Sequence, residues 1–315
     1  MDNSDRGNGL RWSIAVPEPR FGMTVSPAFL AAAARNLESA GFDAIWVSDH
    51  PLPVDLSIPR EAGIAPTAKL GAGHQTWDPF SALAWLSQVT TRVKLHANAV
   101  VLPYRNPFIT AKAAATVQHL SGGRLIMSLA AGYLQAEFDA LGVDIDRRRE
   151  LMDEGVSALK AAWAGKPFAM HTSRWKVDGN AALPAPDPHP TLWRAGNSYS
   201  AIAYAARCCD GWIPFEVSDD NARATRTAPL EAGSGLRERI TLFRQLCAES
   251  GRPTSLDVSL VRMNWNGWTG RPRQQVREEL AELRAMGVTW IVTTLATNEE
   301  TEFARRLDTL RTLVL

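Results

Sequence analysis

Short runs of apolar and β-branched residues alternate along the chain with longer segments whose apolar residues recur at helical spacing. Eight of these runs have the length and composition of strands that are buried on both faces. They cover residues 10–16, 44–48, 94–101, 124–130, 191–195, 211–214, 255–264 and 290–295. The helical segments cover residues 27–40, 78–90, 107–120, 148–163, 198–207, 235–250, 273–286 and 299–313. This alternation predicts an α/β fold, a (β/α)8 TIM barrel.

The residues at the ends of these segments support the assignment. Ser26 and Asp78 each precede a proline at the start of a predicted helix, as capping residues do, and Gly41 ends the first helix. An open, doubly wound sheet is the alternative, and it often has a glycine-rich turn after its first strand. Here Pro17 and Pro19 follow the first strand, and they cannot form that turn.

Connection lengths indicate where the barrel carries insertions. We expect residues 10–315 to form one barrel domain, and the polar residues 1–9 to be a disordered lead-in. The connections at 49–76, 164–190 and 215–234 are long for a compact domain. Loops of this length are often lids or binding elements, so we expect some of them to cover a site.

Composition restricts the class of partner. The 34 Lys and Arg residues nearly balance the 33 Asp and Glu residues, and a net charge of +1 gives no broad attraction to nucleic acid or to a membrane surface. The three cysteines, Cys208, Cys209 and Cys247, lack the number and spacing of a disulfide framework or a zinc site. No apolar run reaches the length of a membrane span, and no signal peptide is apparent. We therefore expect a cytoplasmic protein that acts on a small molecule.

In a TIM barrel the active site lies at the C-terminal ends of the strands. Asp49 and His50 end the second predicted strand, where an imidazole can donate a hydrogen bond or move a proton near neutral pH. The alternative is that the two residues only shape the following loop. We predict that Trp212, in the short sixth strand, and His74 and Trp77, before the second helix, line a substrate pocket.

A second feature follows the fifth predicted strand. Gly196 allows close backbone approach, and Asn197 and Ser198 open a helix whose N–H groups can bind an anion. Simple helix capping is the alternative explanation. Ala131 and Gly132 form a similar turn of small residues after the fourth strand.

Other barrel chemistries lack their characteristic residues. The chain has no His-x-His, which metal-dependent hydrolase barrels commonly carry, so we expect no metal site. A phosphate-binding isomerase or aldolase would need a catalytic lysine or a Glu/His pair at the strand ends. No lysine occupies such a position, since Lys94 begins its strand at the opposite end of the barrel.

Several blocks resemble the luciferase-like superfamily of flavin- and deazaflavin-dependent oxidoreductases. They are Ala-Gly-Phe-Asp-Ala-Ile-Trp-Val-Ser-Asp-His at 40–50, Val-Leu-Pro-Tyr-Arg-Asn-Pro at 101–107, Leu-Ser-Gly-Gly-Arg-Leu at 120–125, and the segment 190–198 with its Trp-x-x-Gly-Asn-Ser pattern. The similarity spans roughly residues 10–215 and is weaker beyond. The resemblance implies an isoalloxazine-type ring at the strand ends and, often in this family, a homodimer.

The resemblance also assigns roles to individual residues. The predicted cofactor-binding residues are Asp49 and His50 beside the ring, Asn98, Ala99 and Val100 in a bulge under it, Ala131, Gly132 and Tyr133 near the tail, and Gly196, Asn197, Ser198 and Tyr199 at the phosphate. In the family the bulge often has a non-prolyl cis peptide, which here falls at one of the two bonds between 98 and 100.

The resemblance favours the deazaflavin coenzyme F-420 over FMN, and with it hydride transfer to or from a small organic substrate. His50 is then the residue that hydrogen-bonds or protonates near the reacting centre, assisted by Tyr133. Tyr133 stands where some deazaflavin dehydrogenases have a glutamate, so a mechanism with that acid is not expected. Two alternatives stay open: an FMN-dependent monooxygenase that uses oxygen, and a barrel that binds the cofactor without catalysis.

Overall fold

The computed structural model describes residues 9–19, 24–52, 76–224, 226–230, 233–263, 270–295, 297 and 299–315. Eight parallel strands close into a barrel in the order β1-β10-β9-β8-β7-β4-β3-β2, which confirms the predicted TIM barrel. The strands are β1 (Arg11–Ala15), β2 (Ala44–Val47), β3 (Lys94–Val101), β4 (Leu125–Ala130), β7 (Thr191–Ala195), β8 (Gly211–Ile213), β9 (Asp257–Val261) and β10 (Trp290–Thr293).

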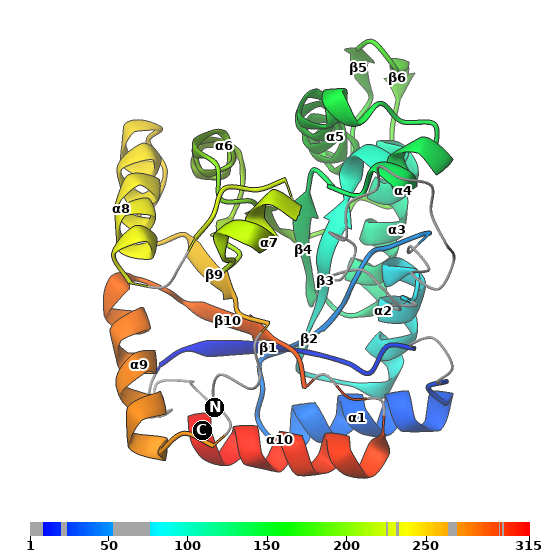
Figure 1. Ribbon diagram of the computed structural model, residues 1–315. Helices are drawn as coiled ribbons and strands as arrows, with labels where there is room; N and C mark the ends of the chain where they lie inside the picture. Colours follow the sequence, from blue (N-terminus) through cyan, green and yellow to red (C-terminus); the bar gives the residue numbers. More distant parts are fainter. Residues whose placement is uncertain are drawn as a thin grey trace, which may run out of the picture.

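Helices surround the barrel, as Figure 1 shows. They are α1 (Pro27–Ser39), α2 (Pro79–Val89), α3 (Pro107–Leu120), α5 (Arg148–Trp163), α6 (Tyr199–Cys208), α8 (Ser234–Glu249), α9 (Arg273–Met286) and α10 (Glu300–Val314). The side chains of Ser26 and Asp78 accept hydrogen bonds from the first turns of α1 and α2, so both expected caps are present. In the described part of the chain, no helix is long and apolar enough to cross a membrane.

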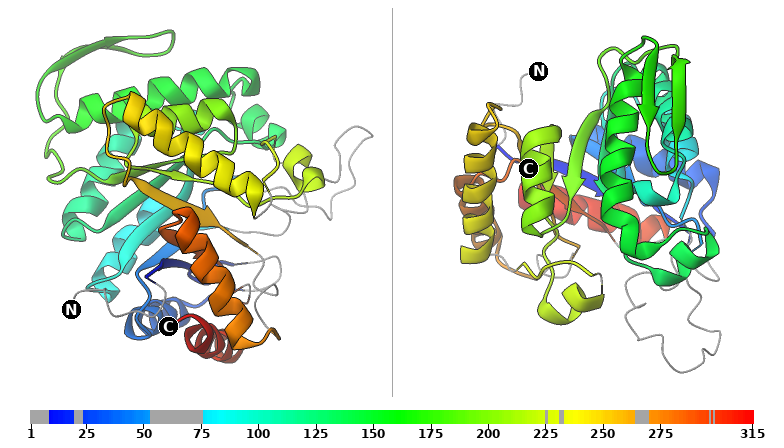
Figure 2. Two further views of the ribbon diagram at one scale, coloured as in Figure 1. Left: turned by 90° about the vertical axis from the view of Figure 1, so that its left-hand side faces the viewer. Right: turned by 90° about the horizontal axis from the view of Figure 1, so that it is seen from above.

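Smaller elements occupy the long connections. The interval 164–190 contains an antiparallel hairpin, β5 (Phe168–His171) and β6 (Lys176–Asn180), which projects from the helical layer in Figure 2. Four short helices also occur: η3 (Leu102–Tyr104), α4 (Gln135–Ala140), η4 (Ile145–Arg147) and α7 (Asp219–Ala224). The expected lead-in and most of the long connection after β2 lie outside the described residues.

The barrel interior is mainly aromatic and aliphatic, with one polar layer. Trp193 and Trp290 pack edge to face there, with ring centroids 5.3 Å apart. The His96 ring lies between the hydroxyls of Ser13 and Ser128, at 2.9 and 2.6 Å, and burial lowers the pKa of His96 to about 3. His96 is therefore neutral, and its two ring nitrogens are both satisfied inside the core.

Arg124, in the Leu-Ser-Gly-Gly-Arg block, is a buried structural clamp. Its guanidinium donates to the backbone carbonyls of Ser87, Thr90, Val93 and Ser121 at 2.7–3.1 Å. One cation thereby satisfies carbonyls at the end of α2, before β3 and after α3. These hydrogen bonds give the arginine of the Leu-Ser-Gly-Gly-Arg block a role in folding. The clamp lies at the end of the barrel away from the cavity described below.

Candidate functional site

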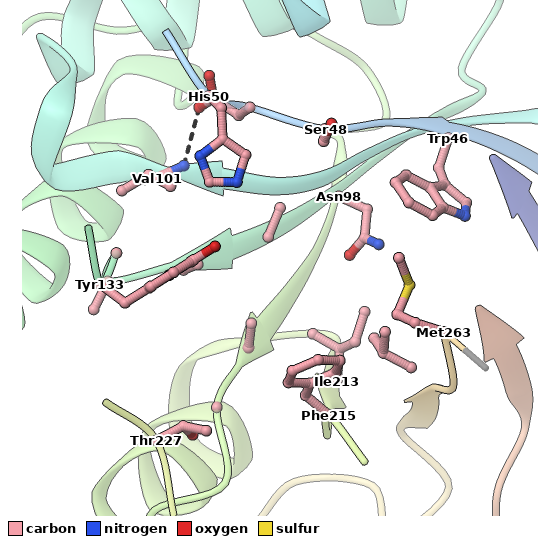
Figure 3. A pocket seen from close by; sticks show the side chains of 18 of the residues that line it. Trp46, Ser48, His50, Asn98, Val101, Tyr133, Ile213, Phe215, Thr227 and Met263 are labelled. Atoms are coloured by element: carbon pink, nitrogen blue, oxygen red, sulfur yellow. Dashed lines mark hydrogen bonds between the residues drawn. The ribbon is translucent and has the colours of Figure 1, made fainter. Parts of the chain in front are cut away.

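A cavity of about 690 Å³ opens at the C-terminal ends of the barrel strands. Each of the eight strands, or the segment that directly follows it, contributes to its wall. Figure 3 shows part of this wall: His50 and Tyr133 lie on one side of the cavity, and Trp46, Ile213 and Met263 on the other. The location is the one that the barrel topology predicts for an active site.

The end of β3 forms the expected bulge. The register of β3 against β4 shifts between Ala97 and Val100, and the peptide bond between Asn98 and Ala99 is cis. Asn98 and Ala99 line the cavity, whereas Val100 is fully buried and does not. Of the two bonds left open by the sequence, the first is therefore the cis one, and the predicted contact of Val100 with a cofactor is corrected.

Asp49 ties together the ends of two strands. Its buried carboxylate accepts from the backbone N–H of Val101 at 3.0 Å and from the Arg105 guanidinium at 2.6 and 3.0 Å. Arg105 also reaches Asp78 at 3.3 Å. Asp49 lines the cavity, and its carboxylate is engaged by structural donors, as the loop-shaping alternative predicts.

His50 contacts a carboxylate that the sequence analysis did not single out. Its Nδ1 lies 3.1 Å from Oε2 of Glu137 in α4, and Glu137 is completely buried. The same carboxylate accepts from the Tyr104 hydroxyl at 3.1 Å and from the Leu52 N–H at 3.2 Å. Three hydrogen-bonding groups from separate segments therefore converge on this one buried carboxylate.

The pKa values of the surrounding groups follow from these contacts. Burial by itself lowers the pKa of His50, but the hydrogen bond and charge of Glu137, with the charges of Asp49 and Glu18, raise it above its ordinary value of 6.5. Burial, reinforced by Glu137, raises the pKa of Tyr133 to about 12. Burial and Glu137 likewise raise the pKa of Tyr104, so both phenols stay protonated near neutral pH.

Glu18 is a second carboxylate that the sequence analysis missed. It follows β1, lines the cavity, and accepts from the Ser48 N–H at 2.9 Å and from the Ser48 hydroxyl at 2.7 and 2.8 Å. These bonds join the segments after β1 and β2 at the cavity wall.

One end of the cavity is cationic. Ser198 caps α6 through its hydroxyl, and Gly196 before it has φ of 126°, a conformation that favours glycine. Arg194, Arg148, Arg149 and Arg226 also line this cavity; they are the only lysine or arginine residues in the described part of its wall.

Arg194 is the buried member of this group. Its guanidinium donates to the carbonyls of Leu129 and Ala195, while its Nε is buried without a hydrogen-bond partner among the described residues. Burial lowers the pKa of Arg148, and the neighbouring charges of Arg226 and Arg149 lower it further. The concentrated positive charge and the unsatisfied Nε fit an anionic ligand.

Another part of the cavity wall is apolar. Trp46, Ile213, Phe215 and Met263 face the cavity in Figure 3. The indole N–H of Trp46 is already used, because it donates to the carbonyl of Thr293 at 2.8 Å. The ring therefore offers mainly its apolar surface, and this part of the cavity suits an uncharged organic group.

Other predicted site residues lie elsewhere. Trp212 is fully buried, packs against Phe243 with ring centroids 5.8 Å apart, and donates from its indole N–H to the Gly196 carbonyl. It belongs to the core and not to a substrate pocket. Trp77 packs against the core outside the cavity wall, and His74 lies outside the described residues.

Around the start of α6, the prediction is correct for part of the segment. Gly196 and Ser198 line the cavity, but Tyr199 is 64% exposed and outside it. Asn197 is buried, and its amide bonds the backbone of Phe215 and the carbonyl of Ala228, so it positions the loop after β8. Ala131, Gly132 and Tyr133 all line the cavity. No group of metal-binding side chains occurs within the described ranges.

Two curated relatives come from mycobacteria. An uncharacterized protein of Mycobacterium tuberculosis is 34% identical over 199 residues, which covers 60% of this chain and 69% of that protein. A phthiodiolone/phenolphthiodiolone dimycocerosates ketoreductase of Mycobacterium kansasii is 28% identical over 264 residues, which covers 79% of this chain and 66% of the ketoreductase.

Solved structures share the fold over nearly the whole chain. The monooxygenase RslO1 from Streptomyces bottropensis superposes with a TM-score of 0.71 at 19% identity and covers 97% of this chain and 98% of its own. An F-420-dependent secondary alcohol dehydrogenase, solved with an F-420–acetone adduct, gives 0.70 at 15% identity and covers 97% and 99%. The model of the luciferase-like monooxygenase family matches residues 13–310. The chain therefore belongs to the luciferase-like family, whose members include oxidoreductases and monooxygenases.

Proposed function

We propose that the protein is an oxidoreductase that transfers a hydride between the deazaflavin coenzyme F-420 and a small organic substrate. The observation that carries the proposal is the composition of the cavity wall, which includes four arginines and the start of α6. In Figure 3 a histidine faces its apolar residues. The cationic end suits a phosphorylated tail, and the remainder suits a flat ring with a substrate over it.

The residues at the cationic end fit the tail of such a cofactor. Ser198, Gly196 and the first turn of α6 supply polar contacts, and the buried Nε of Arg194 needs an acceptor. The four arginines of the wall carry more positive charge than one phosphate needs. FMN has a single phosphate, whereas F-420 has a phosphodiester followed by carboxylates, so this charge favours the deazaflavin.

The reaction uses the cofactor for its electrons and the protein for position and proton transfer. Bound deazaflavin supplies or accepts a hydride and reacts poorly with oxygen. Asn98 and Ala99 form the surface on which a ring can rest, and His50 and Tyr133 hold protons beside it. The apolar residues Trp46, Phe215 and Met263 exclude water from the substrate.

A titration of the purified protein with F-420 and with FMN tests this proposal, with ring fluorescence as the readout. We expect F-420 to bind at least tenfold more tightly than FMN, on the order of 1.4 kcal/mol. Tighter binding of FMN would favour the monooxygenase alternative, which the fold shared with RslO1 supports equally. Binding of neither cofactor would exclude the oxidoreductase.

A further inference from the structure

The carboxylate of Glu137 has one basic neighbour in the described structure. Its oxygens accept from His50 Nδ1, from the Tyr104 hydroxyl and from the Leu52 N–H, and its one ion pair is with His50. The side chain is completely buried. A buried carboxylate is unfavourable unless it is paired, so the fold favours a positive charge on the only basic group that reaches it.

The three acidic groups that face His50 in the described structure all raise its pKa. Glu137 approaches from α4, Asp49 from the end of β2, and Glu18 from the segment after β1. The Tyr133 ring lies edge-on to the imidazole at a centroid distance of 6.0 Å, and it is uncharged near neutral pH. Arg105 neutralises part of this field by pairing with Asp49, which leaves Glu137 as the partner in direct contact.

The bond to Glu137 also fixes which nitrogen is available. Nδ1 is occupied by Glu137, and Nε2 has no hydrogen-bond partner among the described residues. The ring lines the cavity and points into it in Figure 3, opposite the apolar wall of Trp46, Ile213 and Met263. A protonated Nε2 in this place is a hydrogen-bond donor and an acid, and not a base.

We propose that Glu137 is a positioning residue that holds His50 as an imidazolium, and that the site thereby reduces an apolar ketone or aldehyde by giving its oxygen the Nε2 proton. The inference rests on the proposed function, because the carbonyl carbon takes a hydride, with both electrons, from the reduced deazaflavin. The electron pair of the C=O π bond moves to oxygen, which takes the proton from Nε2 and becomes a hydroxyl. Neutral His50 then regains a proton from solvent.

The test measures the ionisation of His50 directly, by NMR titration of the histidine ring signals of the full chain without cofactor. Loss of one signal in His50→Asn assigns the residue, and neutral His96 serves as an internal reference. We expect the wild-type His50 midpoint to lie above 6.5. A wild-type midpoint at or below 6.5 would overturn the proposal, whether or not any variant folds.

Two variants separate charge from packing. Glu137→Gln keeps the shape but removes the charge, and we expect it to lower the His50 midpoint by at least about one pH unit. Tyr104→Phe removes another donor to the same carboxylate and keeps its charge, so the midpoint should stay or rise. A midpoint that falls equally in both variants, or in neither, would contradict the role of Glu137.

Turnover adds a second readout that a merely structural role would not move. With reduced F-420 and an apolar ketone, the rate of the wild type should fall as the pH rises through the His50 midpoint, and that fall should begin at lower pH in Glu137→Gln. If the pH profile of turnover is the same in Glu137→Gln as in the wild type, the inference is overturned. The proposed function is still supported in that case, provided that F-420 binds. Absence of F-420 binding would remove the proposed function, and the carbonyl-reduction step with it, whatever the ring titration shows.

Discussion

His50 Nδ1 lies 3.1 Å from Glu137 Oε2, although the two residues are 87 positions apart in the chain. One comes from the end of β2 and the other from α4, a short helix after β4. Closure of the barrel brings the two residues together. Because Glu137 is buried beside it, the imidazole of His50 has a raised pKa. The contact engages Nδ1 of His50 and leaves Nε2 as the nitrogen available to a ligand.

The contact should also appear in the pH dependence of stability. The pKa of His50 is raised in the folded protein, so its proton stabilises the fold fully below about pH 6.5, its unfolded value. This stabilisation is lost as the pH rises through the folded value. We expect the difference in melting temperature between the wild type and His50→Gln to shrink from pH 6 to pH 9, in thermal scans at both pH values. A difference that grows with pH would contradict the assignment.

Arg194 provides a test of the cationic end. Arg194→Met removes the buried cation and retains most of the apolar side chain, and we expect F-420 to bind roughly 10- to 100-fold more weakly, as for a lost charged hydrogen bond. Thermal stability should not fall by a comparable amount, because the wild-type guanidinium is buried with an unsatisfied Nε. Fluorescence titration and thermal melts measure the two effects. The matched control is Arg277→Met, at an exposed position of α9 outside the cavity wall; equal affinities for both variants would refute a binding role.

Arg124 should matter for folding and not for binding. Arg124→Met leaves carbonyls of Ser87, Thr90 and Val93 without their shared donor, and we expect a loss of roughly 2–4 kcal/mol in unfolding free energy. Chemical denaturation measures this loss. The cofactor affinity of the folded fraction should stay within about twofold, since the clamp is at the opposite end of the barrel. A variant of wild-type stability would show that the clamp is dispensable.

Alanine substitutions at two glycines can separate the effect of steric crowding of the new Cβ atom from the effect of backbone strain. Gly132 and Gly142 both have positive φ, 85° and 65°. A Cβ at Gly132 would lie 2.7 Å from Val101 and 2.9 Å from Phe138, whereas a Cβ at Gly142 meets nothing within 4 Å. Gly132→Ala should therefore destabilise the protein by about 1–3 kcal/mol more than Gly142→Ala, as judged by denaturation. Equal losses of unfolding free energy in the two variants would mean that backbone strain alone accounts for the glycine at position 132.

The fold was largely predictable because its signals are local. The helix caps at Ser26 and Asp78 and the buried strands could be recognised from the sequence, because each of these features depends only on neighbouring residues. Their alternation predicted the barrel. The hairpin of β5 and β6 was missed because its exposed alternate residues give no buried run to detect. The cavity position followed from the topology.

Side-chain direction limited the prediction of the site. In a strand, successive side chains face opposite sides, so Ile213 lies inside the barrel while Trp212 packs outward against Phe243. A position at a strand end therefore does not specify a place in the cavity. No local feature assigned a role to Glu137, because its significance depends on burial and on a partner distant in the chain.

The most direct test of the central claim is a single-turnover experiment. The protein is loaded with reduced F-420 and mixed anaerobically with apolar ketones, and the absorbance of the ring is followed. We predict re-oxidation of the ring that depends on ketone concentration, with one alcohol formed per ring oxidised. A ring that binds but shows no ketone-dependent change, or turnover that requires reduced FMN and oxygen, would contradict the account.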